Sequence, residues 1–431
     1  MAKKSKIQES NFLYSFLRPI VDFKARHSYR RFEVHGLERL PKDAALIYGI
    51  NHSNTLMDAL VVLATSRHKK VFMARGDIFA NPTIAKILRF LRILPLFRIR
   101  NGVAAVKNNT DSMEQAVDVV HDHVGLYMFP EGRHRTKHSL LQLSKGIFHI
   151  AMDSNREFGQ DRPVYLVPVG IEYGDYFRYR STCLVHFGDP INVTDFIKNS
   201  TEENEAVLMN QLRGMLSERL SKLITYIPDD EDYDATWEIV KMKNEKRVGG
   251  LYNKMLRNRE TVRRIQEYKA AHPEEAKALF AKVLDFAGKR VKNKISVTST
   301  AKRHPLLNSL WKLLVALVGL PYFLASTAIN AIAWIPTVII KAKLKDRAWG
   351  NTVSFAGKLL VFPLVLVGGT IALFCTLPWY WALAGLVPLT YSYDFWYDYQ
   401  ELVRRMISDI RWAFKTKLKK DYRSLGLNKL F

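Results

Sequence analysis

The chain has 431 residues, 48% of them hydrophobic, and a formal net charge of +24 from 65 lysines and arginines against 41 aspartates and glutamates. The length suits two to three domains with a sizeable core, and the charge indicates an anionic partner: nucleic acid, anionic lipid or a phosphorylated substrate. No nucleic acid is expected, because no helix-turn-helix, RNA-recognition or zinc-finger pattern accompanies the charge. The two cysteines, Cys183 and Cys375, exclude a disulfide framework and a paired metal or redox motif, and they indicate a reducing compartment.

Residues 1–35 are predicted to form an N-terminal segment that associates with a membrane. The segment has no uninterrupted apolar core of the kind that a secretory signal needs. Over residues 11–35, apolar side chains recur at helical spacing between arginines and lysines. This pattern predicts an amphipathic helix, interrupted near Pro19, on an anionic membrane face. A helix packed on the domain that follows is the alternative.

Residues 36–225 alternate short β-rich runs with helical patterns, which predicts an α/β domain whose central, mostly parallel sheet is flanked by helices. The predicted strands are 46–50, 70–74, 125–129, 165–170 and 183–187. The predicted helices are 56–66, 83–92, 111–122, 144–155 and 203–224. Ligands bind outside the carboxyl ends of the strands in such sheets, so the segments that directly follow the strands are where a site is expected.

The rest of the chain divides into two further predicted domains. Residues 226–304 are rich in charge and predict a helical connector, with helical stretches at 237–254 and 274–289. Residues 305–431 are predicted to be membrane-embedded helices with a basic tail. Two runs in this part, 313–340 and 359–393, carry no charged residue, and each exceeds the roughly 20 residues that cross a bilayer as a helix.

Basic residues precede, separate and follow the two apolar runs, and basic flanks prefer the cytosolic side of a membrane. If all three flanks stay on that side, each run forms a membrane-embedded helical hairpin, with candidate turns at 319–321 and 376–378. This is the predicted topology. In the alternative topology each run is one spanning helix and the loop between them is exported. A soluble core is the third possibility.

The segment after strand 46–50 has the residues needed to deprotonate a hydroxyl group. His52 suits a general base because imidazole titrates near neutral pH. Asp58 can accept a hydrogen bond from the other ring nitrogen, which fixes the tautomer and stabilises the imidazolium, as in the serine-hydrolase triad. Five residues separate the two, and on a regular helix that offset turns their side chains apart. They can meet only if His52 lies in a loop and Asp58 on the first turns of the helix after it.

The segment after strand 125–129 is suited to holding a phosphate. It reads Phe-Pro-Glu-Gly-Arg over residues 129–133. Gly132 lets the backbone turn closely, and Arg133 and Arg135 can supply positive charge. Glu131 cannot bind phosphate directly, and we expect it to orient a cation or hold the turn.

These motifs together resemble the glycerolipid acyltransferase family, whose members acylate glycerol phosphates at a membrane. The resemblance covers about residues 30–225 and rests on four blocks that come in the family's order. The blocks are 51–58, 93–102, 129–146 and 165–171. The family usually has four residues between the histidine and the aspartate, and the spacer of five found here is similar to that of its fungal-type branch.

The family resemblance implies a role for each block. His52 would be the general base and Asp58 the residue that orients it. The residues implied to hold the substrate phosphate are Arg98 (with Arg100 as second choice), Glu131, Gly132, Arg133 and Arg135. Val167 and Pro168 would form the wall for the acyl donor or the acyl chain.

The activity implied is that of a membrane-bound O-acyltransferase of phospholipid biosynthesis, with its catalytic domain on the cytoplasmic face. An acyl group would pass from acyl-CoA or acyl-carrier protein to the hydroxyl of glycerol 3-phosphate, or of 1-acylglycerol 3-phosphate to give phosphatidic acid. The acyl thioester is a co-substrate, and neither a cofactor nor a metal is expected, because thiolate is a good leaving group. The partners are a phosphorylated glycerol acceptor, this donor and anionic lipid. The alternative is a catalytically silent lipid-binding or membrane-organising protein with the same fold.

Overall fold

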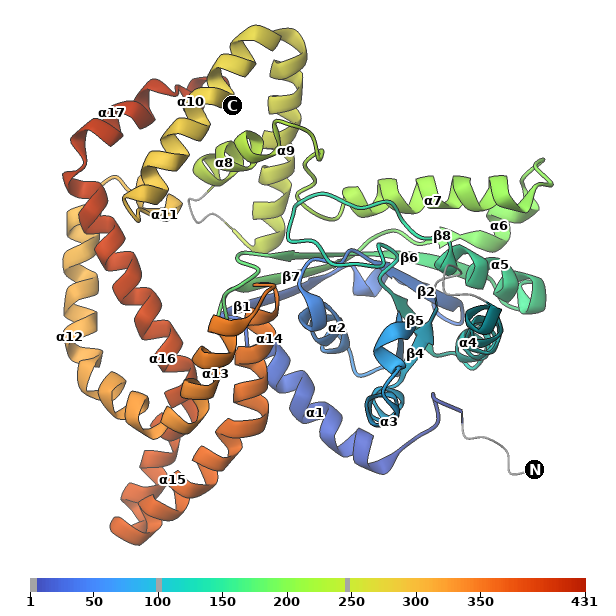
Figure 1. Cartoon of the computed structure of the whole chain (residues 1–431), viewed down its shortest axis with the longest axis horizontal. Coiled ribbons are helices and arrows are strands. Elements are labelled where there is room, and N and C mark those ends of the chain that lie inside the picture. Colours follow the sequence, from blue (N-terminus) through green and yellow to red (C-terminus); the bar gives the residue numbers. More distant parts are fainter. Residues whose placement is uncertain (1–5, 98–102, 245–248) are drawn as a thin grey trace. The chain divides into compact units, whose positions relative to one another are not determined.

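The computed structural model describes residues 6–97, 103–244 and 249–431, and the chain divides into two compact units (Figure 1). The first unit comprises Met1–Phe177 and Ser181–Ile224, and contains the sheet. The second, called the helical unit, comprises Thr225–Phe431 together with the three residues Arg178–Arg180. The chain therefore leaves the first unit for three residues, between two of its strands, and then returns.

The first unit is built on a mixed, mostly parallel sheet, which confirms the predicted fold class. Over the described residues the sheet has eight strands in the order β1-β7-β6-β2-β5-β3-β4, with β8 also pairing with β6. Its strands are β1 (Arg31–His35), β2 (Ala45–Ile50), β3 (Lys70–Arg75), β4 (Ile93–Leu96), β5 (Gly125–Met128), β6 (Val164–Tyr173), β7 (Thr182–Phe187) and β8 (Ile191–Asn192). Only β7 and β8 run antiparallel to their neighbour β6. All five predicted strands are present.

Helices cover the sheet on both faces, with α7 above it and α1, α2 and α3 below it in Figure 1. The helices of this unit are α1 (Phe12–His27), α2 (Thr55–Leu63), α3 (Pro82–Phe90), α4 (Val103–His121), α5 (Gly146–Phe158), α6 (Val193–Lys198) and α7 (Glu205–Ser221). Gly49 of β2 shows how closely they pack: a Cβ atom there would lie 2.9 Å from Leu216 of α7 and 3.3 Å from Ile147 of α5. All five predicted helices have a counterpart.

The N-terminal segment differs from the prediction in two ways. Helix α1 runs through Pro19 without interruption and ends at His27. Residues 31–35 are not helical but form β1, which pairs in parallel with β7, Arg31 standing opposite Thr182. The prediction of a helix up to residue 35 was therefore wrong. A five-residue edge strand is stabilised by a partner strand about 150 residues away, and that partner cannot be recognised from the strand's own sequence.

Three basic side chains secure the C-terminal end of α2. Arg18 of α1 donates to the carbonyl of Leu63 at 3.2 Å, Arg26 donates to carbonyls just after the helix, and Lys70 of β3 also reaches Leu63, at 3.3 Å. Positive charge at a helix C-terminus complements the helix dipole and satisfies the last carbonyl groups. These bonds hold in place a helix whose first turn carries Asp58.

The helical unit contains helices over nearly all of its described length, which confirms the predicted helical C-terminal region. The helices are α8 (Tyr233–Lys243), α9 (Leu251–Ala271), α10 (Pro273–Lys292), α11 (Val297–Thr300), α12 (Pro305–Ile329), α13 (Ala331–Lys343), α14 (Trp349–Ala356), α15 (Phe362–Thr376), α16 (Trp379–Phe414), α17 (Thr416–Ser424) and α18 (Leu427–Leu430). A π-helical turn, Gly357–Val361, joins α14 to α15. The single helix predicted over 237–254 is wrong, because α8 ends at Lys243 and α9 begins at Leu251.

One of the two predicted membrane turns is also wrong. Helix α12 continues through Pro321, and the chain breaks instead at Asn330, whose side chain donates to Ser326 O at 2.9 Å and to Ser392 Oγ of α16 at 3.0 Å. The second turn does fall at 377–378, between α15 and α16. By length and composition, two helices among the described residues, Pro305–Ile329 and Trp349–Thr376, could cross a membrane, and little of either is buried.

Lys70 makes the stability of the first unit depend on pH. Its buried amine donates to Ser66 O at 2.7 Å, and burial together with the nearby charge of Arg18 lowers its pKa to about 7. In the unfolded chain a lysine titrates near 10.4, so between about pH 7 and pH 10 the unfolded state binds more protons. The free energy of unfolding of the wild type should therefore rise with pH across that window.

We expect Lys70→Met to lose this pH dependence. The free energy of unfolding of the wild type should therefore rise relative to that of the variant as pH rises from about 7 to about 10. The measurement is the denaturant midpoint of detergent-purified protein at several pH values. Lys69→Met, at the exposed neighbouring position, is the control and should follow the wild type. Parallel curves for Lys70→Met and the wild type would contradict the expectation.

Candidate active site

The site forms where β2 and β5 end side by side. These strands pair in parallel, with Gly49 opposite Met128, so the segments after them leave the same edge of the sheet. The backbone N–H of His52 donates to Glu131 Oε1 at 2.9 Å, and the N–H of Arg135 donates to the carbonyl of His52 at 3.0 Å. The two motifs that the sequence singled out, 79 residues apart in the chain, are therefore joined by hydrogen bonds.

His52 and Asp58 contact each other in the way that their spacing required. His52 lies in the loop before α2, and Asp58 lies on the first turn of α2. The distance from His52 Nδ1 to Asp58 Oδ2 is 2.8 Å. The Asp58 side chain is fully buried, whereas that of His52 keeps 18% of its surface exposed. The imidazole therefore has one nitrogen held by the protein and an edge open to solvent.

Asp58 is surrounded by hydrogen-bond donors. Its Oδ2 accepts from the backbone N–H groups of Ser53 at 2.8 Å and Asn54 at 2.7 Å, and its Oδ1 accepts from the hydroxyl of Tyr173 at 2.8 Å. Removing a carboxylate from water costs much free energy unless such donors satisfy it. The donors also fix the carboxylate, so His52 Nδ1 carries the proton that faces it and Nε2 is left as the basic nitrogen.

A strained turn lets a spacer of five residues bring these groups together. Thr55, the first residue of α2, has a left-handed φ of +47°, which is an outlier for a β-branched side chain. Such a conformation costs on the order of 1–3 kcal/mol and persists only where its surroundings impose it. Here the turn aims the N–H groups of Ser53 and Asn54 at one oxygen of Asp58.

Glu131 holds the turn, which was one of the two roles expected for it. Its Oε1 accepts from the His52 N–H, and its Oε2 accepts from the N–H of Leu141 at 3.0 Å. Burial raises the pKa of this carboxyl group above its ordinary value, and the two N–H bonds oppose that rise. Gly132 follows with a φ of +66°, a left-handed conformation that glycine adopts at little cost, and donates to Phe129 O at 3.0 Å.

The predicted phosphate ligands lie in different surroundings. The side chain of Arg133 is exposed beside the site loop, and Arg135 is half-buried, with its Nη2 donating to Ser139 Oγ at 2.7 Å. Arg98 and its second choice Arg100 lie outside the described residues. Their contact with a phosphate stays a prediction from the family resemblance.

Strand β6 supplies two kinds of residue to this region. Val167 and Pro168 are buried within the sheet, in register with Tyr48 and Gly49 of β2, and their role beside the acyl donor stays a prediction. Tyr173, at the end of β6, was missed, because the strand was predicted to stop at residue 170. Extending that strand pattern would have placed Tyr173 at the carboxyl edge of the sheet.

Two further residues that the sequence analysis left without a role shape the site. The Asn51 side chain continues the β2–β6 ladder past the strand end, donating to Ile171 O at 3.1 Å and accepting from the Ile171 N–H at 2.6 Å. Phe129 stacks on the His52 ring, with a centroid distance of 4.4 Å and an interplanar angle of 27°. Both restrict where His52 can lie.

The arrangement can serve as a general base beside a basic turn. His52 has a fixed tautomer, a buried anion behind it and an open edge in front. In the described part of the chain, no group of three His, Cys, Asp or Glu side chains is arranged to hold a metal ion.

Part of the chain is similar to known proteins. A family model described as Acyltransferase matches residues 31–172, which include His52, Asp58 and the 129–135 segment. Among solved structures the chain is similar to the 1-acyl-sn-glycerophosphate acyltransferase PlsC from Thermotoga maritima. The identity is 19% and the TM-score 0.35, over 48% of this chain and 80% of that one. No curated protein matches the chain.

We expect Glu131→Gln to destabilise the protein by about 1–3 kcal/mol, because the amide leaves one of two buried N–H groups facing another donor. The free energy of unfolding, measured by denaturant, gives the cost. Glu157→Gln, at an exposed site, is the control and should change it by less than about 0.5 kcal/mol.

The cost of Glu131→Gln should also depend on pH. A carboxyl group whose pKa is raised by folding contributes stability that is present below its unfolded value, near 4.3, and is lost as pH rises through the raised value. The difference between wild type and variant should therefore be largest in acid and level off toward neutral pH. No loss of stability at any pH would contradict the role assigned to Glu131.

Proposed function

We propose that this protein is a membrane-associated O-acyltransferase of phospholipid biosynthesis. It moves a fatty acyl group from acyl-CoA or acyl-carrier protein to the hydroxyl of a glycerol phosphate, which is glycerol 3-phosphate or 1-acylglycerol 3-phosphate. The observation that carries the proposal is the 2.8 Å contact between His52 Nδ1 and the buried Asp58, beside a basic turn at the carboxyl edge of the sheet. The family-model match over residues 31–172 supports the reaction class, and the spacer of five residues supports the fungal-type branch.

The proposed reaction needs only one proton carrier. His52 Nε2 takes the proton of the acceptor hydroxyl as its oxygen attacks the thioester carbonyl carbon. The tetrahedral oxyanion then collapses, the C–S bond breaks, and the leaving thiolate takes the proton back from His52. Asp58 stabilises the imidazolium between these steps, as the aspartate of a serine-hydrolase triad does. A positioned base of this kind contributes roughly 10²–10⁴-fold to the rate.

The phosphate of the acceptor is assigned to the basic side of the site. Arg133 and Arg135 follow Gly132 on the loop that is hydrogen-bonded to His52. A guanidinium group suits phosphate because its planar fork can donate two parallel hydrogen bonds. The family resemblance adds Arg98 as a third cation, and it places the acyl chain near Val167 and Pro168.

The first unit carries a surface suited to an anionic membrane. Phe12 and Phe16 of α1 are 88% and 62% exposed, with Ile20 and Phe23 on the same side, whereas Tyr14 on the other side is buried. A helix with an exposed aromatic face and basic flanks lies in the interface of a bilayer. We propose that α1 does so at the cytoplasmic face, which would bring the site to the surface where the acyl chain partitions.

We expect His52→Ala to lower the turnover of acyl transfer by about 10²–10⁴-fold with folding intact, because the base is lost. Asp58→Asn should also lower it by at least about 10²-fold, since the imidazole loses its tautomer and its counter-ion. Thiol release from long-chain acyl-CoA in the presence of acceptor gives the rate. His68→Ala, at an exposed histidine, is the control. A His52→Ala protein with most of its activity would end this mechanism and favour another chemistry.

The proposed placement of α1 can be measured with a spin label. In a background without Cys183 and Cys375, a label on Phe16→Cys in anionic vesicles should be more accessible to dissolved oxygen than to an aqueous nickel complex, because oxygen concentrates in the bilayer. A label on Lys198→Cys, at an exposed position of α6, should show the reverse. Equal aqueous access at both positions would rule out the interfacial placement.

A further inference from the structure

In the described part of the helical unit, two helices are long and apolar enough to cross a bilayer, and their polar contacts decide which of them can enter one. By length and composition alone, both α12 and the α14–α15 segment qualify as spans. Each forms polar contacts with particular residues along the long helix α16. Those contacts, together with the path of the chain, give the membrane arrangement of this unit.

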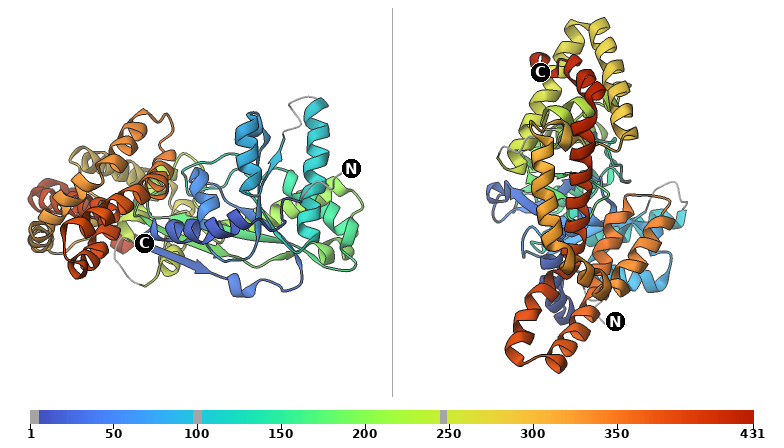
Figure 2. Two further views of the ribbon diagram at one scale, coloured as in Figure 1. Left: turned by 90° about the horizontal axis from the view of Figure 1, so that it is seen from below. Right: turned by 90° about the vertical axis from the view of Figure 1, so that its left-hand side faces the viewer.

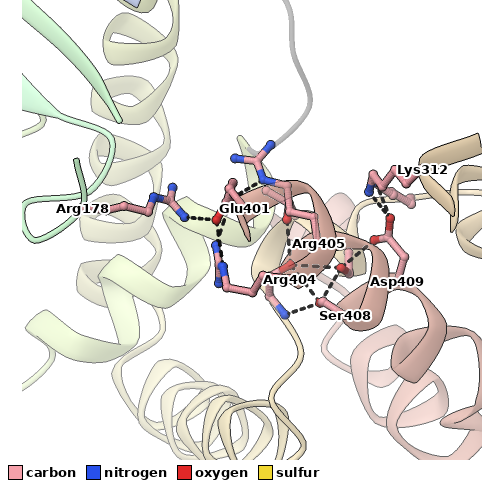
Figure 3. A network of polar contacts seen from close by, with 11 residues as sticks. Arg178, Lys312, Glu401, Arg404, Arg405, Ser408 and Asp409 are labelled. Atoms are coloured by element: carbon pink, nitrogen blue, oxygen red, sulfur yellow. Dashed lines mark hydrogen bonds and ion pairs between the residues drawn. The ribbon is translucent and has the colours of Figure 1, made fainter. Parts of the chain in front are cut away.

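Helix α12 lies antiparallel along α16, as both Figure 1 and Figure 2 show. At one end Lys312 of α12 pairs with Asp409 of α16 (Figure 3). Further along, Tyr399 of α16 donates to the carbonyl of Ala316 at 2.9 Å. At the far end Asn330 donates to Ser392 at 3.0 Å. Helix α12 must therefore lie at the same depth in a membrane as residues 392–409 of α16.

That part of α16 carries charge on several sides. Asp409 accepts from Lys302 at 2.7 Å and from Lys312, and Glu401 binds Arg404 and Arg405 (Figure 3). The side chains of Arg404 and Arg405 remain 58% and 38% exposed. A guanidinium group that faces hydrocarbon costs free energy that a water-facing one does not. Residues 394–409 are therefore expected to lie outside the hydrocarbon core.

The three residues Arg178–Arg180 fix the side of the membrane on which this part lies. The buried side chain of Tyr179 donates to Asp394 at 3.0 Å. Arg180 donates to both oxygens of Asp398 at 3.2 and 2.9 Å, and Arg178 donates to Glu401 at 2.7 Å.

The chain on either side of these three residues belongs to the first unit. Three residues extend to about 10 Å at most, whereas the hydrocarbon core is about 30 Å thick. The acidic positions of α16 that bind them must therefore be on the same side of a bilayer as the first unit.

Residues 362–393, which directly precede Asp394, carry no charged side chain and are the segment suited to insertion. It consists of α15, which has 15 residues, a turn at 377–378, and residues 379–393 of α16, a similar length. At about 1.5 Å per residue each arm reaches roughly 22 Å, which is short of the roughly 30 Å core. Lys358 closes the base of this hairpin by donating to both oxygens of Asp394 at 2.7 and 2.6 Å. The beginning of the first arm and the end of the second arm therefore lie at the same depth relative to the bilayer.

The surfaces of these helices suit lipid. Trp379 and Trp381, at the start of the second arm, are exposed. Helix α12 presents an exposed stripe at helical spacing on the side away from α16. The stripe consists of Leu307, Leu310, Trp311, Leu314, Leu317 and Val318. The exposed side chains of Lys343, Lys345 and Arg347, between the apolar runs, complement anionic head groups.

We propose that the helical unit is a one-sided membrane module whose partner is an anionic lipid bilayer. The hairpin 362–393 dips into the bilayer from the side of the first unit and returns. Helix α12 does not cross it, but lies at the surface with its apolar stripe toward the lipid. This inference rests on the proposed function only for the presence of a membrane. Its test reads topology rather than turnover, so the two can fail separately.

The test is cysteine labelling of the full chain in sealed anionic vesicles with a membrane-impermeant maleimide. Three proteins carry one cysteine each: native Cys375 at the hairpin tip, Lys345→Cys between the runs, and Lys198→Cys in the first unit as the marker of orientation. Cys183, buried in β7, is replaced by alanine in all three, and Cys375 by alanine in the last two.

We expect Lys345→Cys to be labelled from outside in the same fraction of molecules as Lys198→Cys. Cys375 should react with the reagent only after detergent is added, whichever compartment the reagent occupies. Labelling of Lys345→Cys in the complementary fraction would show that α12 crosses the bilayer and would overturn the proposal. Reaction of Cys375 from the lumen, or release of the protein by alkaline carbonate, would overturn it as well.

Discussion

The rest of the site depends on the hydrogen bonds that the buried carboxylate of Asp58 accepts. This carboxylate requires donors because it is fully buried, and it finds them in two loop N–H groups, Tyr173 and His52. Satisfying it imposes the left-handed turn at Thr55 and sets the tautomer of His52. The opposite end of the same helix is held by basic side chains from α1 and β3. Glu131 fixes the backbone of His52 from the neighbouring strand, so the position of the base is determined twice.

Much of this site could be predicted from local sequence. The two motifs follow strands that could be recognised from their composition. The rotation per residue of an α-helix was enough to require that His52 lie in a loop ahead of Asp58. The bond from Tyr173 to Asp58 could not be predicted, because it joins residues 115 apart and depends on β6 lying beside β2. The conformation of Thr55 could not be expected either, since β-branched residues avoid it, and here it accompanies the N–H bonds from Ser53 and Asn54 to the buried carboxylate.

The helical unit shows the opposite balance. Its apolar runs were plain in the sequence, but their arrangement depends on distant partners. A break was expected near Pro321, yet α12 continues there, and the chain turns at Asn330, where a side chain of α16 accepts a hydrogen bond. The tripeptide Arg178–Arg180 reads as an ordinary basic loop between two strands. In the structure, its three side chains donate hydrogen bonds to three carboxylates of α16, which the sequence did not indicate.

The most direct test of the account is whether the purified wild-type protein makes an acylated glycerol phosphate. Long-chain acyl-CoA and acyl-carrier protein would each be offered with glycerol 3-phosphate and with 1-acylglycerol 3-phosphate in parallel, and the products identified by mass. The account predicts thiol release that depends on one of these acceptors, with the acyl group recovered on its hydroxyl. Thioester consumption without an acceptor, or no acylated product from any pairing with a folded protein, would contradict it.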